Sequence, residues 1–157
     1  MIRTYLSFTI CNDHYAVNVE KVLEVLQEEY ITSVPNAPSY IRGIINVRGD
    51  VVPVFETRVR FNLPSRDSGE SYNIIVLDIS EGSEKLRLGA IVDKVKDVIS
   101  FDDADIKPVP PMSSEFNTDF LQGIHKIGNE FIMLLNVEKV FTGKELQSFS
   151  KATKTEL

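Results

Sequence analysis

Short apolar stretches that alternate with polar residues dominate the pattern of this chain. Residues 6–10 and 15–19 place an apolar side chain at every second position, with a turn-forming Asn12-Asp13 pair between them. A period of two is typical of strands with one buried face. Many such short runs, separated by turn residues, predict a mainly β protein built from small barrels.

The stretch 43–55 predicts a tight hairpin. Two β-branched runs flank the turn residues Arg48-Gly49-Asp50, and Gly49 can adopt the positive φ that such turns require. Residues 39–42 are expected to form a short helical turn before it. Pro53 has no N–H to donate, so the second strand is expected to lie at a sheet edge or to turn its N–H side outward.

The hairpin pattern returns 80 residues later. Residues 123–135 match 43–55 without a gap, and three further pairs of segments match at offsets of 69, 73 and 75, which rise in chain order. Two copies of one unit, the second with longer loops, produce this pattern, so the sequence predicts an internal duplication. The further pairs are 5–10 with 74–79, 19–25 with 92–98, and 31–35 with 106–110.

The duplication predicts one domain over residues 1–157, made of two lobes at about 4–70 and about 72–141. The polar stretch 62–71 is the expected boundary between the copies. The sequence leaves open whether strands are exchanged between the lobes. Residues 142–157 form a polar tail that is expected to fray.

The connecting segments give weaker signals. Residues 18–27 fit either a capped helix or a bend near Glu20 followed by a strand. The matching residues 95–99 alternate cleanly and are rich in β-branched side chains, which favours the bend and the strand. Asn136 could cap a short helix after the second hairpin. Gly82-Ser83 is expected to form a turn, and residues 108–119 a long proline-rich loop.

Charge and composition exclude several classes of function. The chain has 23 acidic and 17 basic residues, a net charge of -6, and no basic stripe. Binding to nucleic acid or to an anionic membrane surface is therefore not expected. The longest apolar run, 131–135, is far too short to cross a bilayer. Cys11 is the single cysteine, which fits a reducing compartment, and the N-terminal residues lack the apolar core of a signal peptide.

Candidate catalytic and metal-binding groups carry little weight. Cys11 and His14 are three positions apart, but the sequence shows no third group to orient the histidine, and His125 alternates within an expected strand. The acidic cluster 102–105 has Lys107 where a calcium loop needs glycine. Phosphate-binding loops and paired-cysteine motifs do not occur. We expect no metal, no cofactor and no enzyme activity; a small acidic hydrolase using Asp or His is the alternative.

Six motifs spread between Tyr5 and Val140 point to a family. They are 22–25 (VLEV), 34–38 (VPNAP), 41–49 (IRGIINVRG), 52–54 (VPV) with Arg58, 89–95 (GAIVDKV) and 135–140 (LNVEKV). Together they resemble the CheW family of chemotaxis coupling proteins. The resemblance implies two SH3-like, five-stranded β-barrel lobes with short helical turns and a short C-terminal helix. Ala16, Glu56 and Thr57 depart mildly from the family pattern.

The resemblance also implies partners. CheW-like proteins are non-catalytic adaptors that bind the regulatory domain of the histidine kinase CheA and the cytoplasmic tip of chemoreceptors. They are cytoplasmic, join receptor arrays at the inner membrane through these partners, and self-associate in rings. The alternatives are an adaptor of another chemosensory system that drives surface motility, and a generic SH3-like peptide binder.

The family pattern implies positions for these contacts. The expected kinase-facing residues are Leu6, Val19 and Val22. The expected receptor-facing residues are Val25, Gly43, Val95 and Val98. Glu24 and Arg48 are expected to form a charge pair that shapes the receptor-facing region.

Overall fold

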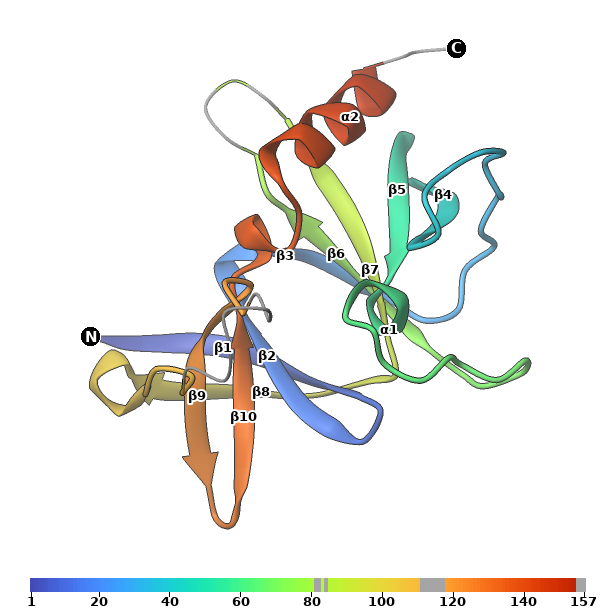
Figure 1. Cartoon of the computed structure of the whole chain (residues 1–157). Coiled ribbons are helices and arrows are strands. Elements are labelled where there is room, and N and C mark those ends of the chain that lie inside the picture. Colours follow the sequence, from blue (N-terminus) through green and yellow to red (C-terminus); the bar gives the residue numbers. More distant parts are fainter. Residues whose placement is uncertain (81–82, 84, 111–117, 155–157) are drawn as a thin grey trace.

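Two five-stranded sheets make up most of the computed structural model, which describes residues 1–80, 83, 85–110 and 118–154, the last five by their backbone (Figure 1). In spatial order, the first sheet contains β8 (Lys94–Asp102), β1 (Ile2–Ile10), β2 (Asp13–Asn18), β10 (Glu130–Leu135) and β9 (Leu121–Ile127). The second sheet contains β3 (Val22–Leu26), β6 (Asn73–Asp78), β7 (Arg87–Val92), β5 (Asp50–Glu56) and β4 (Ile41–Val47).

The two sheets have the same topology. In each, a central hairpin, β1–β2 or β6–β7, has an edge strand on one side, β8 or β3, and a second hairpin on the other, β9–β10 or β4–β5. The two hairpins meet in parallel, β2 with β10 and β7 with β5. Figure 1 shows β2 beside β10, although they are far apart in the sequence. Each sheet thus combines the first hairpin of one copy with the last three strands of the other copy, so strands are exchanged.

A short backbone bridge joins the two edges of each sheet. Thr32 follows the edge strand β3 and exchanges two hydrogen bonds of 2.9 Å with Ile44 on the opposite edge. In the first sheet Lys107 follows β8 and exchanges bonds of 2.8 and 2.9 Å with Ile124. These bridges close each sheet into a small barrel. The expected mainly β fold with two five-stranded barrels is confirmed.

The helices lie in connections between strands, except the last two, which follow the last strand. The helices are η1 (Val19–Lys21), α1 (Thr57–Arg60), η2 (Asp103–Asp105), η3 (Val137–Lys139) and α2 (Gly143–Lys154). The bend predicted near Glu20 is η1, whose start is capped by Asn18 Oδ1 accepting the Glu20 N–H at 2.9 Å. Asn136 precedes η3, but its side chain makes no capping hydrogen bond.

Two local expectations need correction, and two others cannot be compared with the structure. The strand with Pro53 is not an edge: β5 lies between β4 and β7, and its pairing with β7 starts at Val54, after the proline. Residues 39–40 form a turn closed by the Ile41 N–H on the Pro38 carbonyl at 2.9 Å, and strand β4 starts at Ile41, so the helical turn over 39–42 is wrong. Gly82 and most of the loop 108–119 lie outside the described residues.

The polar tail also differs from expectation. From Gly143 the chain forms α2, and Phe149 on this helix is 6% exposed within the main core. The phenyl ring of Phe149 meets that of Phe141 edge to face, with 5.2 Å between ring centroids. A largely polar helix thus packs a buried aromatic side chain into the core, with Leu146 beside it.

The main core is shared by both sheets. Its buried cluster includes Leu6 and Phe8 of β1, Val17 of β2, Leu77 of β6 and Leu88 of β7. Since burial of apolar surface is the main favourable term in folding, the two barrels stabilise each other. Within the described residues, no helix is both long and apolar enough to cross a membrane.

Candidate interaction surfaces

The expected kinase-facing residues lie where the chain passes from the first sheet to the second. Val19 is in η1 and Val22 begins β3, and both are half-buried against the main core. Leu6 belongs to that core on β1 and is only 8% exposed. A partner can therefore contact Val19 and Val22 directly, while Leu6 mainly supports the surface from beneath.

The expected receptor-facing residues divide into two exposed and two covered positions. Val25 on β3 and Val98 on β8 are 41% and 64% exposed. They are equivalent in the two copies and lie on equivalent edge strands of the two sheets. Val95 is half-buried against the main core, and Gly43 is buried in β4. Of the four residues, Val25 and Val98 are therefore the ones whose side chains a partner can reach most readily.

The two expected sets are not cleanly separated. Val98 of the receptor set is the cross-strand neighbour of Leu6, which belongs to the kinase set. Val22 and Val25 lie on one strand, three positions apart. Leu23, 45% exposed on the same strand, is an accessible apolar residue that the sequence reasoning missed. The β-branched and leucine residues of the motif 22–25 signalled a strand but not which side chains face out.

Glu24 and Arg48 are brought together. The Nε atom of Arg48 is 3.5 Å from Oε2 of Glu24. Glu24 is on β3 and Arg48 is in the β4–β5 turn, so the ion pair links opposite edges of the second sheet rather than neighbouring strands. Arg48 and Gly49 both have positive φ, 53° and 91°, and the Gly49 N–H donates to Asn46 Oδ1 at 2.8 Å. The backbone conformation of this turn and its hydrogen bond to Asn46 thus fix the position from which the Arg48 side chain extends.

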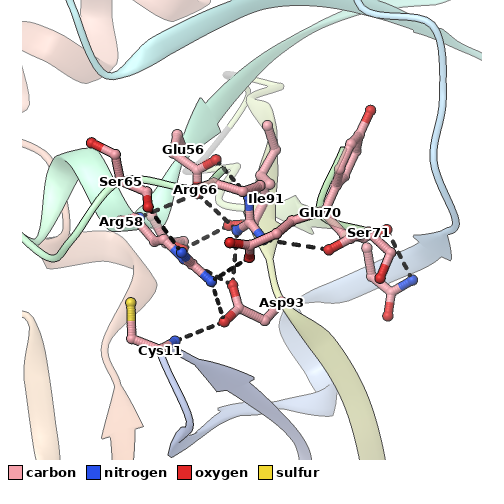
Figure 2. A network of polar contacts seen from close by, with 12 residues as sticks. Cys11, Glu56, Arg58, Ser65, Arg66, Glu70, Ser71, Ile91 and Asp93 are labelled. Carbon is pink, nitrogen blue, oxygen red and sulfur yellow. Dashed lines mark hydrogen bonds and ion pairs between the residues drawn. The ribbon is translucent and has the colours of Figure 1, made fainter. Parts of the chain in front are cut away.

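A buried ion network that the sequence reasoning did not find lies between the sheets (Figure 2). The Asp93 carboxylate accepts hydrogen bonds from Arg58 Nε at 3.1 Å and Nη2 at 2.8 Å, and Arg66 Nη2 is 2.9 Å away. Arg66 also donates to both carboxylate oxygens of Glu56, each at 3.1 Å. Arg58 Nη2 further donates to Glu70 at 3.1 Å.

The electrostatics of the network follow from burial and pairing. Burial alone would raise the pKa of Asp93, but the bonds from Arg58 and from the Cys11 N–H lower it, and the net pKa lies below its usual range. The hydrogen bond to Asp93 raises the pKa of Arg58. Asp93 and Arg58 are therefore both held in their charged forms at neutral pH.

A family model of the CheW-like domain matches residues 4–145. The chain belongs to the CheW family. It is 29% identical to the chemotaxis protein CheW of Klebsiella aerogenes, over 96% of this chain and 89% of that protein. It is 30% identical to the probable chemotaxis protein CheW of Rhizobium etli, over 93% and 92% of the two chains. The crystal structure of the scaffolding protein TtCheW from Thermoanaerobacter tengcongensis matches with a TM-score of 0.78 and 30% identity, over 90% and 93% of the chains.

The groups considered for catalysis have structural partners in this CheW-family chain. His14 Nε2 is 3.1 Å from Glu130 Oε2, while the Cys11 thiol is directed at the Pro64 carbonyl, 3.8 Å away. His125 stacks on Phe101 with 4.3 Å between ring centroids. Among the described residues no cluster of three His, Cys, Asp or Glu side chains is arranged to hold a metal ion.

Proposed function

We propose that this chain is a non-catalytic adaptor that couples chemoreceptors to a CheA-type histidine kinase in chemotaxis signalling. Its membership of the CheW family and its similarity to proteins named chemotaxis protein CheW and scaffolding protein support this proposal. The observation that carries it is the pair of equivalent exposed valines, Val25 and Val98, on the edge strands of two barrels that share one core.

The kinase-facing surface is formed by Val19 and Val22 above Leu6. It suits the regulatory domain of the kinase, because small barrels dock on each other through a few apolar anchors surrounded by polar groups. The ion pair between Lys21 and Glu138 supplies such polar groups next to Val19 and Val22. Through this ion pair the surface extends from η1 and β3 to η3, which lies near the other end of the sequence.

The receptor-facing surface is formed by Val25, Val95 and Val98, with the Glu24–Arg48 ion pair at its margin. An amphipathic helix that packs its apolar face into a groove fits such valines, and the receptor tip is a helical hairpin. Gly43 contributes by letting the segment at Thr32 pack against β4. We further propose that the protein is located in the cytoplasm at receptor arrays, which it joins through its partners, and that it self-associates in rings.

Calorimetric titration tests the proposal. The wild-type protein is titrated with the regulatory domain of the CheA-type kinase, and separately with a receptor fragment that contains the cytoplasmic tip. Val22→Asp is expected to abolish kinase binding and Val98→Asp receptor binding, each by placing a charge among apolar anchors. Val51→Asp is the matched control, since Val51 is 40% exposed on β5, a strand that carries none of the residues assigned to either surface.

Circular dichroism establishes that each variant is folded before its binding is interpreted. Loss of kinase binding in a folded Val22→Asp variant, with Val51→Asp unchanged, supports the coupling role. Absence of binding by the wild-type protein to both partners contradicts it and points to another chemosensory system.

A further inference from the structure

The two places where the chain passes between the sheets are built differently. Between β2 and β3 the chain passes through η1, where Glu20 is exposed. Between β7 and β8 it passes through Asp93, the residue that the duplication aligns with Glu20. The Asp93 side chain is only 19% exposed and sits in the ion network. The duplicated unit therefore has one solvent-exposed crossing and one that is held by buried charges.

The contacts of Asp93 reach both sheets. From the first sheet, the Cys11 N–H in the β1–β2 turn donates to Asp93 Oδ2 at 2.7 Å, and the Asp93 N–H donates to the Thr9 carbonyl at 2.9 Å. From the second sheet, Arg58 lies in α1 directly after β5, and Arg66 lies in the loop that leads to β6. Figure 2 shows the two guanidinium groups and the Cys11 amide converging on this one carboxylate.

The start of β8 has a further link to the second sheet. The Val95 N–H donates to Asn73 Oδ1, at the start of β6, at 2.9 Å. Val95 and Val98 follow Asp93 by two and five positions on β8, and pairing with β1 places them opposite Phe8 and Leu6. The anchoring of β8 at Asp93 therefore bears on where both valines stand relative to the second sheet. Val25, the counterpart of Val98, is on the second sheet.

Stability alone gives a weak reason for such a network. Desolvating ions offsets much of their attraction, and buried ion pairs are often replaced by apolar residues without loss of stability. Their strict geometry, by contrast, fixes one relative placement of the groups that they join. Arg58 and Arg66, at 9% and 10% side-chain exposure, are buried deeply enough for that geometry to be well defined.

We propose that Asp93, with Arg58 and Arg66, is a positioning element that fixes β8 against the second sheet and so sets the spacing between Val98 and Val25. This inference rests on the proposed receptor-facing surface. The kinase-facing Val19 and Val22 lie at the other crossing, in η1 and at the start of β3. Breaking the network is therefore expected to weaken receptor binding selectively.

Distance measurements between spin labels test the positioning directly. Labels at Lys96 on β8 and Val51 on β5 report on the two sheets, in a Cys11→Ala background that keeps the Cys11 backbone amide. Asp93→Asn is expected to shift or broaden the distance distribution. Asp103→Asn is the matched control, because Asp103 directly follows the other end of β8 and forms an ion pair there with Arg3. In the wild type Arg3 Nε is 3.0 Å from Asp103 Oδ2. An unchanged distribution in folded Asp93→Asn overturns the proposal.

Titrations of the unlabelled proteins supply the functional readout. Asp93→Asn is expected to weaken binding of the receptor-tip fragment about tenfold and to leave binding of the kinase regulatory domain within about threefold of wild type. Equal losses for both partners indicate a merely structural role and overturn the proposal. Arg66→Lys, which keeps the charge but not the two-pronged contact, replaces Asp93→Asn in both experiments if the latter does not fold.

The two proposals fail in different ways. If the wild-type protein binds neither partner, the adaptor function is wrong, and the spin-label distances still decide whether Asp93 positions β8. If the wild type binds both partners and neither variant changes the distances or the receptor affinity, the positioning role alone is wrong.

Discussion

Gly43 lies so close to Thr32 that a Cβ atom at position 43 would stand 2.0 Å from the Thr32 carbonyl oxygen. Gly43 has a φ of 148°, and the adjacent Ile44 forms the bridge to Thr32 that closes the second barrel. The clash is with backbone, which side-chain rotation does not relieve. Gly43 is therefore required by the barrel itself, whatever partner binds near it.

Replacing Gly43 by alanine is expected to cost about 3 kcal/mol of unfolding free energy, because it combines backbone strain with overpacking. Gly123→Ala is expected to cost less, since the nearest atom is the Ile106 methyl at 2.5 Å and φ is not positive. Gly143→Ala, which meets nothing within 4 Å, is the control. Urea unfolding measures all three, and equal stability of the Gly43 and Gly143 variants would contradict the order.

Arg48→Ala is expected to keep the fold and weaken receptor binding. The Arg48 side chain is 82% exposed, so its ion pair with Glu24 contributes no more than about 1 kcal/mol to stability. Arg48→Lys keeps the charge and serves as control. Urea unfolding and titration with the receptor-tip fragment check the two halves of this prediction. Unfolding of Arg48→Ala during purification is the result that contradicts it.

Glu145 is expected to make the attachment of α2 dependent on pH. Its carboxylate accepts hydrogen bonds from the Tyr40 hydroxyl at 2.7 Å, from Arg60 at 2.9 and 3.0 Å, and from the Thr142 N–H at 2.8 Å. Burial opposes ionisation, but these bonds lower the pKa of Glu145 to about 2. In the unfolded chain the pKa of a glutamate is about 4.3.

The stabilisation by Glu145 is fully present above the unfolded-state pKa and is lost as the pH falls through the folded-state value. Glu145→Gln is therefore expected to be less stable than wild type at neutral pH, by about 1–2 kcal/mol. The difference should shrink between about pH 5 and pH 2. Urea unfolding of both proteins across this range measures it, and a difference independent of pH would rule out the ionised carboxylate as the cause.

Phe149→Ala is expected to release α2 from the core. Removing a buried phenyl group costs about 3 kcal/mol in a well-packed site. Amide hydrogen exchange should then lose its protection over 143–154 while the sheets keep theirs. Gln147→Ala, an exposed position on the same helix, is the control. Retained protection in Phe149→Ala would show that the polar contacts of Glu145 hold the helix by themselves.

Local chemistry made much of this fold predictable. The positive φ at Gly49 and the alternation around it identified the hairpin, and its repetition at 123–135 identified the duplication. A bend at Glu20 followed from comparing the two copies. Such features depend on residues that are close in sequence, where steric and capping preferences act directly.

Long-range pairing was not predictable from the same signals. Repeat offsets show which strands are equivalent but not which copy's hairpin each strand joins, so the exchange stayed open and the edge alternative for Pro53 was wrong. The ion network joins Arg58 to Asp93 across 35 positions, with no local pattern in either segment to pair them. In the tail, polar composition concealed Phe149, whose burial depends on a distant sheet.

The exchange of hairpins bears on how such a chain could have arisen. A single copy would hold β1 to β5 without the partner hairpin that its last three strands need. Two identical molecules could supply those hairpins to each other, which is a domain-swapped dimer with two-fold symmetry. Fusing the two genes would then preserve both sheets and turn the symmetry axis of a dimer into the internal axis of one polypeptide. The two sheets of the fused protein would then be free to diverge from each other.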